Sequence, residues 1–158
     1  TGKHATTQAC LRFLDRLAAE DAARTVLDMG CGSGILAIGA RRLGFTEVSG
    51  FDNDPDCIRV SQENAAINGV CIPFRLDDLS HVHGPSGVVV ANILAPVLIQ
   101  FAAQVAGSVA PGARSRLVVS GILDGQYAAV RAAYEARGLK EVESLLIENW
   151  RSGLFRRA

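Results

Sequence analysis

The fold is decided by residues 26–36, which read VLDMGCGSGIL. Apolar residues over 25–29 predict a buried strand, the glycines that follow predict a tight turn, and residues 35–43 predict a helix. Glycine permits positive φ and leaves no Cβ in the path of a ligand. The start of the helix offers unpaired N–H groups and a partial positive charge. This stretch therefore predicts a nucleotide-like ligand at the carboxyl end of a parallel strand.

The three glycines of the turn, Gly30, Gly32 and Gly34, alternate along the chain. In the dinucleotide fingerprint G-x-G-x-x-G the third glycine follows the second by three residues, but Ile35 occupies that position here. The spacing therefore disfavours a nicotinamide-dependent oxidoreductase. A glycine-rich turn that binds no ligand is the remaining structural alternative.

Three acidic residues lie at or near the ends of expected strands. Asp28 precedes the glycine turn, where a carboxylate can accept from an amine, or through water from a charged methionine tail. Asp52 closes a strand over residues 48–51 and can bind two ribose hydroxyls. Asp77 follows a strand over residues 71–76, where it can accept from an adenine amine or form a polar turn. The pattern D-x-G-x-G-x-G with the second acid resembles motif I of class I S-adenosylmethionine-dependent methyltransferases, so S-adenosylmethionine is the expected cofactor.

Strand and helix patterns alternate from residue 25 to residue 137. A first helix is expected to end at residue 19, with Thr6 or Thr7 as its N-cap. Further helices are expected over 55–67, from residue 96 and over 124–136. Two more strands are expected over 87–94 and 117–123. Two last strands, over residues 139–148 and 150–157, have so short a link that they must pair antiparallel. The fold class is α/β: a Rossmann-like, doubly wound, mostly parallel sheet with one antiparallel C-terminal strand.

Composition narrows the possible functions. With 158 residues, the chain is long enough for one domain with its own core. It carries 16 basic and 16 acidic residues, which argues against the basic face that direct nucleic-acid binding needs. No apolar run reaches membrane-spanning length and no secretory signal is present. Four scattered cysteines without a C-x-x-C pair indicate reduced, mostly buried thiols and a cytoplasmic setting.

The three histidines carry weaker signals. His4 lies in a polar loop, where a solvated side chain is the ordinary interpretation. His81 and His83 have H-x-H spacing, but we see no third ligand near them in the sequence. A surface loop is therefore favoured over a metal site, and no metal is expected.

Four segments together resemble one family: TGKHATT (1–7), LDMGCGSGILAI (27–38) with FDNDP (51–55), ANILAP (91–96) and VSGIL (119–123). They are similar to the bacterial methyltransferases of ribosomal protein L11, the PrmA type, and the resemblance covers almost the whole chain. It implies N-methylation of a protein at lysine ε-amines and an N-terminal α-amine, with ribosomal protein L11 as the expected acceptor.

The resemblance also implies cofactor contacts at Thr7, Gly30, Asp52 and Asn92. Residues 1–158 are expected to form a single catalytic domain, with residues 1–20 as a loop and helix that cap the cofactor. The family carries an N-terminal substrate-recognition domain ahead of this loop, and this chain has none. Either that domain was removed or this is a lone catalytic domain, so the acceptor and the oligomeric state stay open.

Asn92 is the expected catalytic residue, because it ends an all-apolar strand at the ligand edge of the sheet. We expect its side-chain carbonyl to accept an N–H from the substrate amine and to aim the amine lone pair at the methyl group. Ile93 and Leu94 would keep the site dry. The alternative is that Asn92 satisfies only backbone or cofactor groups. For the whole chain, the alternatives are a methyltransferase of another protein or a small molecule, and a non-catalytic cofactor-binding module.

Overall fold

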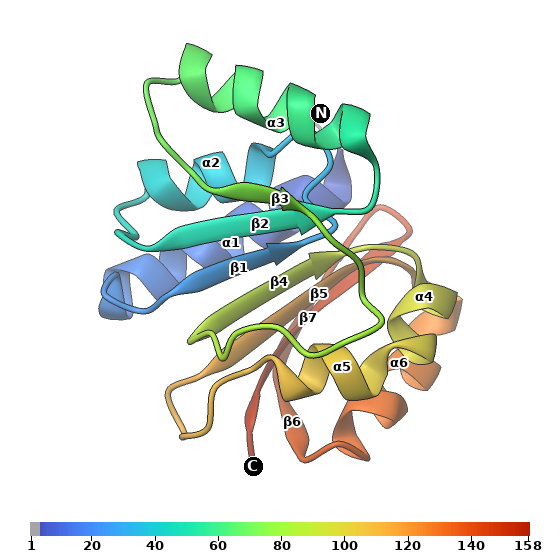
Figure 1. The fold of residues 1–158 in the computed structure, drawn as a ribbon. Coiled ribbons are helices and arrows are strands. Elements are labelled where there is room, and N and C mark those ends of the chain that lie inside the picture. Colours follow the sequence, from blue (N-terminus) through green and yellow to red (C-terminus); the bar gives the residue numbers. More distant parts are fainter. Residues whose placement is uncertain (1–3) are drawn as a thin grey trace.

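The computed structural model describes residues 4–158, which form one seven-stranded sheet. Figure 1 shows helices on both faces of this sheet. The strands are β1 (Val26–Met29), β2 (Val48–Asp52), β3 (Phe74–Leu76), β4 (Val88–Asn92), β5 (Arg116–Leu123), β6 (Leu139–Ile147) and β7 (Trp150–Arg157). The helices are α1 (Ala5–Asp21), α2 (Ile35–Arg42), α3 (Pro55–Ile67), α4 (Ala95–Gln100), α5 (Ala102–Gly107) and α6 (Tyr127–Glu135). The first three residues of the loop expected over 1–7 lie outside the described residues, and α1 already starts within the rest of it.

The strand order across the sheet is β3-β2-β1-β4-β5-β7-β6. Strands β1 to β5 pair in parallel, whereas β7 pairs antiparallel with both β5 and β6. The expected doubly wound sheet with one reversed strand is therefore confirmed. The order changes direction between β1 and β4, and in such sheets the crevice at this switch point is where ligands bind.

Strand β4 explains how the sheet divides the core. Val88 and Val90 belong to the apolar cluster beneath α1 and α2, and Val89 and Ala91 belong to the cluster beneath α4, α5 and α6. Successive side chains of a strand point to opposite faces, so a strand covered on both faces must be apolar throughout. Figure 1 shows the two helical layers on opposite sides of the sheet.

Two helix starts differ in how well the sequence predicted them. Helix α3 begins as expected, with Asp54 as N-cap accepting from the Asp56 N–H at 2.9 Å. The expected N-cap of α1 is wrong, because His4 holds that position and its Nδ1 accepts from the Thr6 N–H at 3.2 Å. An imidazole nitrogen here satisfies the helix N–H that a serine or threonine oxygen more often satisfies.

Other expected elements are shorter than predicted. The helix expected from residue 96 is divided into α4 and α5 at Phe101. The strand expected over 71–76 is reduced to β3, which starts immediately after Pro73, a residue without an N–H to donate. The helix expected from Asp124 starts with a 3-10 turn, and the Asp124 carboxylate binds Arg151 at 2.7 Å instead of capping α6.

All four cysteines are free thiols, but only Cys10 and Cys31 are buried, and Cys71 is exposed. The expectation of mostly buried thiols therefore holds for half of them. Within residues 4–158, no helix is both long and apolar enough to cross a membrane.

Arg24 joins the C-terminal end of α1 to the start of the sheet. Its guanidinium donates to the carbonyl oxygens of Leu17 at 2.6 Å, Asp21 at 3.1 Å and Arg114 at 2.9 Å, and its side chain is 8% exposed. Carbonyls at a helix end have no partner within the helix, so a cation that binds them stabilises the end.

We expect Arg24→Met to lower the free energy of unfolding by about 2 kcal/mol, because three carbonyl oxygens lose a charged donor. Urea denaturation measures this change. Arg137→Met, at an exposed position, is the matched control and should change stability by less than about 0.5 kcal/mol. Equal effects of the two substitutions would contradict the role of Arg24.

Candidate functional site

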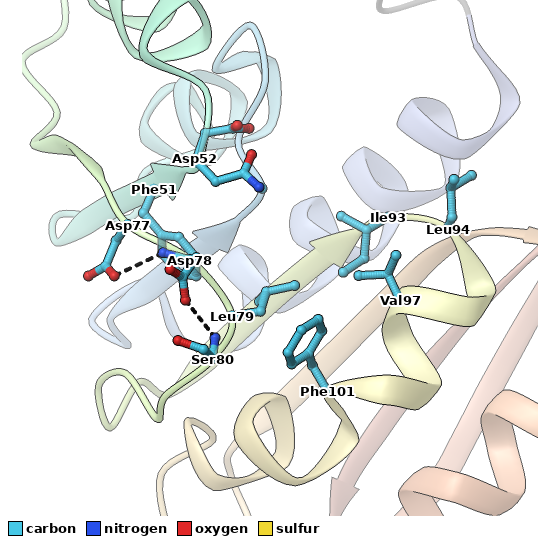
Figure 2. Close-up of a pocket in the computed structure, with 12 residues that line it drawn as sticks. Phe51, Asp52, Asp77, Asp78, Leu79, Ser80, Ile93, Leu94, Val97 and Phe101 are labelled. Atoms are coloured by element: carbon cyan, nitrogen blue, oxygen red, sulfur yellow. Dashed lines mark hydrogen bonds between the residues drawn. The ribbon is translucent and has the colours of Figure 1, made fainter.

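A cavity of about 560 Å³ opens at the carboxyl edge of the sheet, beside the switch point. It is lined by Gly30, Phe51, Asp52, Asn53, Asp77, Asp78, Leu79, Ser80, Ile93, Leu94, Val97 and Phe101. Figure 2 shows that the acidic side chains, from the ends of β2 and β3, lie on one side of this cavity. Side chains that follow β4, among them Val97 and Phe101, form an apolar wall on the other side.

The glycine turn forms part of this site, and its three glycines serve different purposes. All three have positive φ, +69° at Gly30, +54° at Gly32 and +83° at Gly34. A Cβ at Gly30 would lie 2.9 Å from Ile93, and one at Gly34 would lie 3.2 Å from Phe74, so packing requires glycine at both positions. A Cβ at Gly32 would meet nothing within 4 Å, so this glycine leaves open space beside the turn.

Asp52 connects the glycine turn to the cavity. Its Oδ2 accepts from the Gly32 N–H at 3.0 Å, and its Oδ1 accepts from the Asp54 N–H at 3.0 Å. These two bonds fix the carboxylate at the cavity wall. Because a carboxylate has about four acceptor positions, each oxygen can still accept from a hydroxyl. The geometry fits the ribose role expected from the sequence.

Asp28 is a buried acid without enough partners. It is 2% exposed, and its Oδ2 has no hydrogen-bond partner among the described residues. Burial raises the pKa of Asp28 to about 7, a backbone hydrogen bond from Ala37 opposes that rise, and the negative charge of Asp52 adds to it. Nearly all buried polar atoms in proteins are hydrogen-bonded, so the free Oδ2 is suited to a donor that the chain itself does not supply.

Asn92 lies at the end of β4 and is half-buried. Its Nδ2 donates to Thr6 Oγ1 at 3.3 Å. Thr7, the expected cofactor contact, is buried in the first turn of α1. The sequence singled out Thr6 only as a possible N-cap, and its contact with Asn92 crosses 86 positions of the chain, so no local pattern could reveal it.

Asp77 lines the cavity, but basic side chains surround its carboxylate. Arg75 Nε lies 3.5 Å from it and His81 Nε2 lies 3.2 Å from it. The pKa of Asp77 is lowered, first by the hydrogen bond from the Asp78 N–H and then by the charges of His81 and His83. The neighbouring Asp78 also lines the cavity, and its carboxylate accepts from the Ser80 N–H at 2.8 Å.

In the structure Asp77 is a third candidate metal donor beside the two histidines. One ligand atom each of Asp77, His81 and His83 lies within 4.8 Å of the others. However, Arg75 Nη2 lies 3.1 Å from His83 Nδ1, so a guanidinium already pairs with this cluster. His83 is also buried and stacks on Phe51 at 4.1 Å between ring centroids, which corrects the expectation of a surface loop at that position.

Of the site residues predicted from the sequence, Gly30, Asp52 and Asp77 line the cavity. The remaining ones, Thr7, Asp28, Gly32, Gly34 and Asn92, do not line it. Gly32 is joined to it through its hydrogen bond to Asp52, whereas Asn92 is bonded to Thr6 in the first turn of α1, which does not line the cavity. Phe101 and Val97 were predicted only as core positions of a helix, whereas they form the apolar wall.

Comparison with known proteins gives a consistent result. A family model described as "Ribosomal protein L11 methyltransferase (PrmA)" matches residues 1–158. A protein named ribosomal protein L11 methyltransferase from Bradyrhizobium diazoefficiens is 41% identical, over 99% of this chain and 55% of its own length. One of the same name from Azotobacter vinelandii is 50% identical, over 85% of this chain and 46% of its own length. The chain thus spans about half the length of these curated relatives.

Solved structures agree with the fold. The ribosomal protein L11 methylase from Lactobacillus delbrueckii subsp. bulgaricus superposes with a TM-score of 0.89 at 30% identity, covering 99% of this chain and 80% of that one. Magnesium protoporphyrin IX methyltransferase from Synechocystis PCC 6803, solved with bound S-adenosylmethionine, gives a TM-score of 0.78 at 19% identity, covering 96% of this chain and 79% of that one. The second likeness concerns the fold alone.

We expect Asp28→Asn to make the protein more stable at pH 8, by on the order of 2–4 kcal/mol. The folded-state pKa of Asp28 is raised to about 7 from an ordinary value of 3.8, so its favourable contribution is present below pH 4 and is lost as the pH rises through 7. The gain should therefore shrink as the pH is lowered from 8 to 5.

Urea denaturation at several pH values, without added ligand, measures this dependence. Asp15→Asn, at an exposed position of α1, is the control and should give a small, pH-independent change. A variant at Asp28 that is less stable than the parent at pH 8 would contradict the assignment of a strained carboxylate.

Proposed function

This chain belongs to the ribosomal protein L11 methyltransferase (PrmA) family, and we propose that it binds S-adenosylmethionine and methylates amines of a protein. The favoured acceptor is ribosomal protein L11, as in the names of the relatives. The observation that carries the proposal is the cavity at the switch point, bounded by the glycine turn and Asp52. A cytoplasmic location is part of the proposal, because ribosomal proteins are made there.

The residues around the cavity fit this cofactor. Asp52 has lone pairs free for two ribose hydroxyls, and the open space at Gly32 lets a ligand approach the backbone. The unpaired Oδ2 of Asp28 suits the ammonium group of the methionine tail, directly or through water.

An acid on the β3 side, Asp77 or Asp78, is the proposed acceptor for the adenine amine, because both line the cavity. Gly30 and Gly34 shape the turn. Thr7 and Asn92 are further proposed contacts of the cofactor. Because Arg75 and His81 already pair with Asp77, Asp78 is the freer of the two acceptors.

When bound, S-adenosylmethionine supplies an already activated methyl group, so the protein must position and desolvate the acceptor amine. A lysine amine has an ordinary pKa of about 10.4, and freeing its lone pair near pH 7.5 costs about 4 kcal/mol. The apolar wall of Ile93, Val97 and Phe101 disfavours the ammonium form and offsets part of this cost. Leu94 is 65% exposed at the rim, so it excludes water only once an acceptor covers it.

Incubating the chain with methyl-labelled S-adenosylmethionine and purified ribosomal protein L11 tests the proposed activity. We expect label in that protein, and none in a second ribosomal protein of similar charge. Label in another acceptor would replace the substrate assignment. Binding of the cofactor without transfer to any acceptor would favour a non-catalytic binding module instead.

We expect Asp52→Ala to weaken binding of S-adenosylmethionine about 5- to 150-fold, because one or two hydrogen bonds to a charged acceptor are lost. Calorimetry measures the affinity, and thermal denaturation checks that the variant is folded. Asp56→Ala, whose side chain is 85% exposed, is the matched control and should bind like the parent chain. Equal affinities of the two variants would remove the ribose assignment.

A further inference from the structure

The side-chain amide of Asn92 is joined to the first turn of α1 by a chain of hydrogen bonds. Asn92 Nδ2 lies 3.3 Å from Thr6 Oγ1, which lies 2.7 Å from His4 Nδ1. The backbone N–H of Thr6 donates to the same ring nitrogen at 3.2 Å. Neither Thr6 nor His4 lines the cavity.

The direction of each hydrogen bond in this network shows which atom carries each proton. His4 Nδ1 accepts the Thr6 N–H, so it carries a lone pair and the ring proton is on Nε2. The short contact between Nδ1 and Thr6 Oγ1 therefore needs the Thr6 hydroxyl as donor. The Thr6 oxygen is then left with lone pairs only, so it can accept from Asn92.

This order of donors fixes which way the Asn92 amide points. A flipped amide would place Oδ1 against a Thr6 oxygen whose one proton already goes to His4. Two acceptors would then face each other at 3.3 Å without a hydrogen between them. The amide nitrogen is therefore held toward Thr6 and the amide oxygen is held away from it.

Gly121 lies close to the amide on its oxygen side, where a Cβ would crowd the oxygen. It has a φ of +84°, and a Cβ there would lie 3.2 Å from Asn92 Oδ1 and 2.6 Å from the Ile93 carbonyl oxygen. The pairing of β5 with β7 shifts register between Val119 and Ile122, where Gly121 lies. Bulges of this kind often lie next to active sites, where they redirect neighbouring groups.

We propose that Thr6, oriented by His4, is a positioning residue that fixes the Asn92 amide with its oxygen toward the acceptor amine. The inference rests on the function proposed above. An amide oxygen accepts an N–H of the amine and leaves the amine lone pair free to attack the methyl group. A flipped amide would instead donate an N–H to that lone pair and block the attack.

The first turn of α1 is rigid enough for this role. Thr6 is 5% exposed, and its carbonyl oxygen accepts from Ser120 Oγ at 3.4 Å. Ser120 is bonded in turn to Ser152 Oγ at 2.6 Å, which connects the turn to β5 and β7. The ring of His4 meets Trp150 edge-on, at 5.3 Å between centroids.

Comparison of Thr6→Val with Thr6→Ser tests the proposal. Valine keeps the shape of the side chain without its hydroxyl, so we expect kcat to fall about tenfold while KM and the affinity for S-adenosylmethionine change by less than about threefold. Serine restores the hydroxyl and should restore kcat. Thr25→Val is the matched control, because it removes a hydroxyl bonded to the Gly87 N–H at the opposite edge of the sheet.

A second measurement does not depend on activity. The side-chain NH2 signals of Asn92, identified by their loss in Asn92→Ala, should exchange slowly with solvent in the parent chain and in Thr6→Ser. They should exchange faster in Thr6→Val. If the parent chain binds the cofactor but transfers no methyl group, the proposed function fails, and these signals still decide whether Thr6 holds the amide.

If Thr6→Val does not fold, His4→Phe and His4→Asn replace it. Phenylalanine keeps a ring beside Trp150 but removes the acceptor nitrogen, whereas asparagine supplies an acceptor oxygen at the cap. We expect the slower turnover and faster exchange with phenylalanine only. The proposal would be overturned if Thr6→Val, or both His4 variants, had the same turnover and the same exchange rate as the parent chain.

Discussion

The hydrogen bond from the Gly32 N–H to the Asp52 carboxylate, 3.0 Å long, joins the turn after β1 to the end of β2. Neighbouring parallel strands bring their carboxyl ends to one edge, but only a specific contact sets the distance between the loops that follow them. This bond, together with the one from the Cys31 N–H to the Phe51 carbonyl oxygen at 2.9 Å, sets that distance beside the switch point. Because Asp52 also accepts from the Asp54 N–H, the start of α3 is tied to the same carboxylate.

One acidic side chain near Asp52 opposes folding. Asp28 is buried, one of its oxygens has no partner within residues 4–158, and Asp52 adds negative charge nearby. A group that opposes folding is retained when a ligand compensates for it, and stability is commonly exchanged for function in this way. On the opposite wall the side chains are apolar, so one cavity offers both a polar and a dry surface.

The sequence predicted the fold well, because its signals and the structures they specify are both local. Asp54 and Pro55 mark the start of α3, and the apolar run of β4 reflects its burial on both faces. The N-cap of α1 was wrong because an imidazole took the role of a hydroxyl. The Thr6 contact with Asn92 was not predictable, since it joins distant segments whose approach depends on how α1 packs on the sheet.

The two apolar clusters on opposite faces of the sheet pack against different parts of the site. Leu36 and the glycine turn belong with one cluster, whereas Ile93 and Phe101 pack against the other. The two faces meet where Ile93 packs over Gly30, so substitutions at these two positions are expected to be coupled, whereas substitutions at distant positions on opposite faces are usually additive. Substitutions in the layer of α4 and α5 that leave Ile93 in place can therefore reshape the apolar wall of the cavity without disturbing the glycine turn.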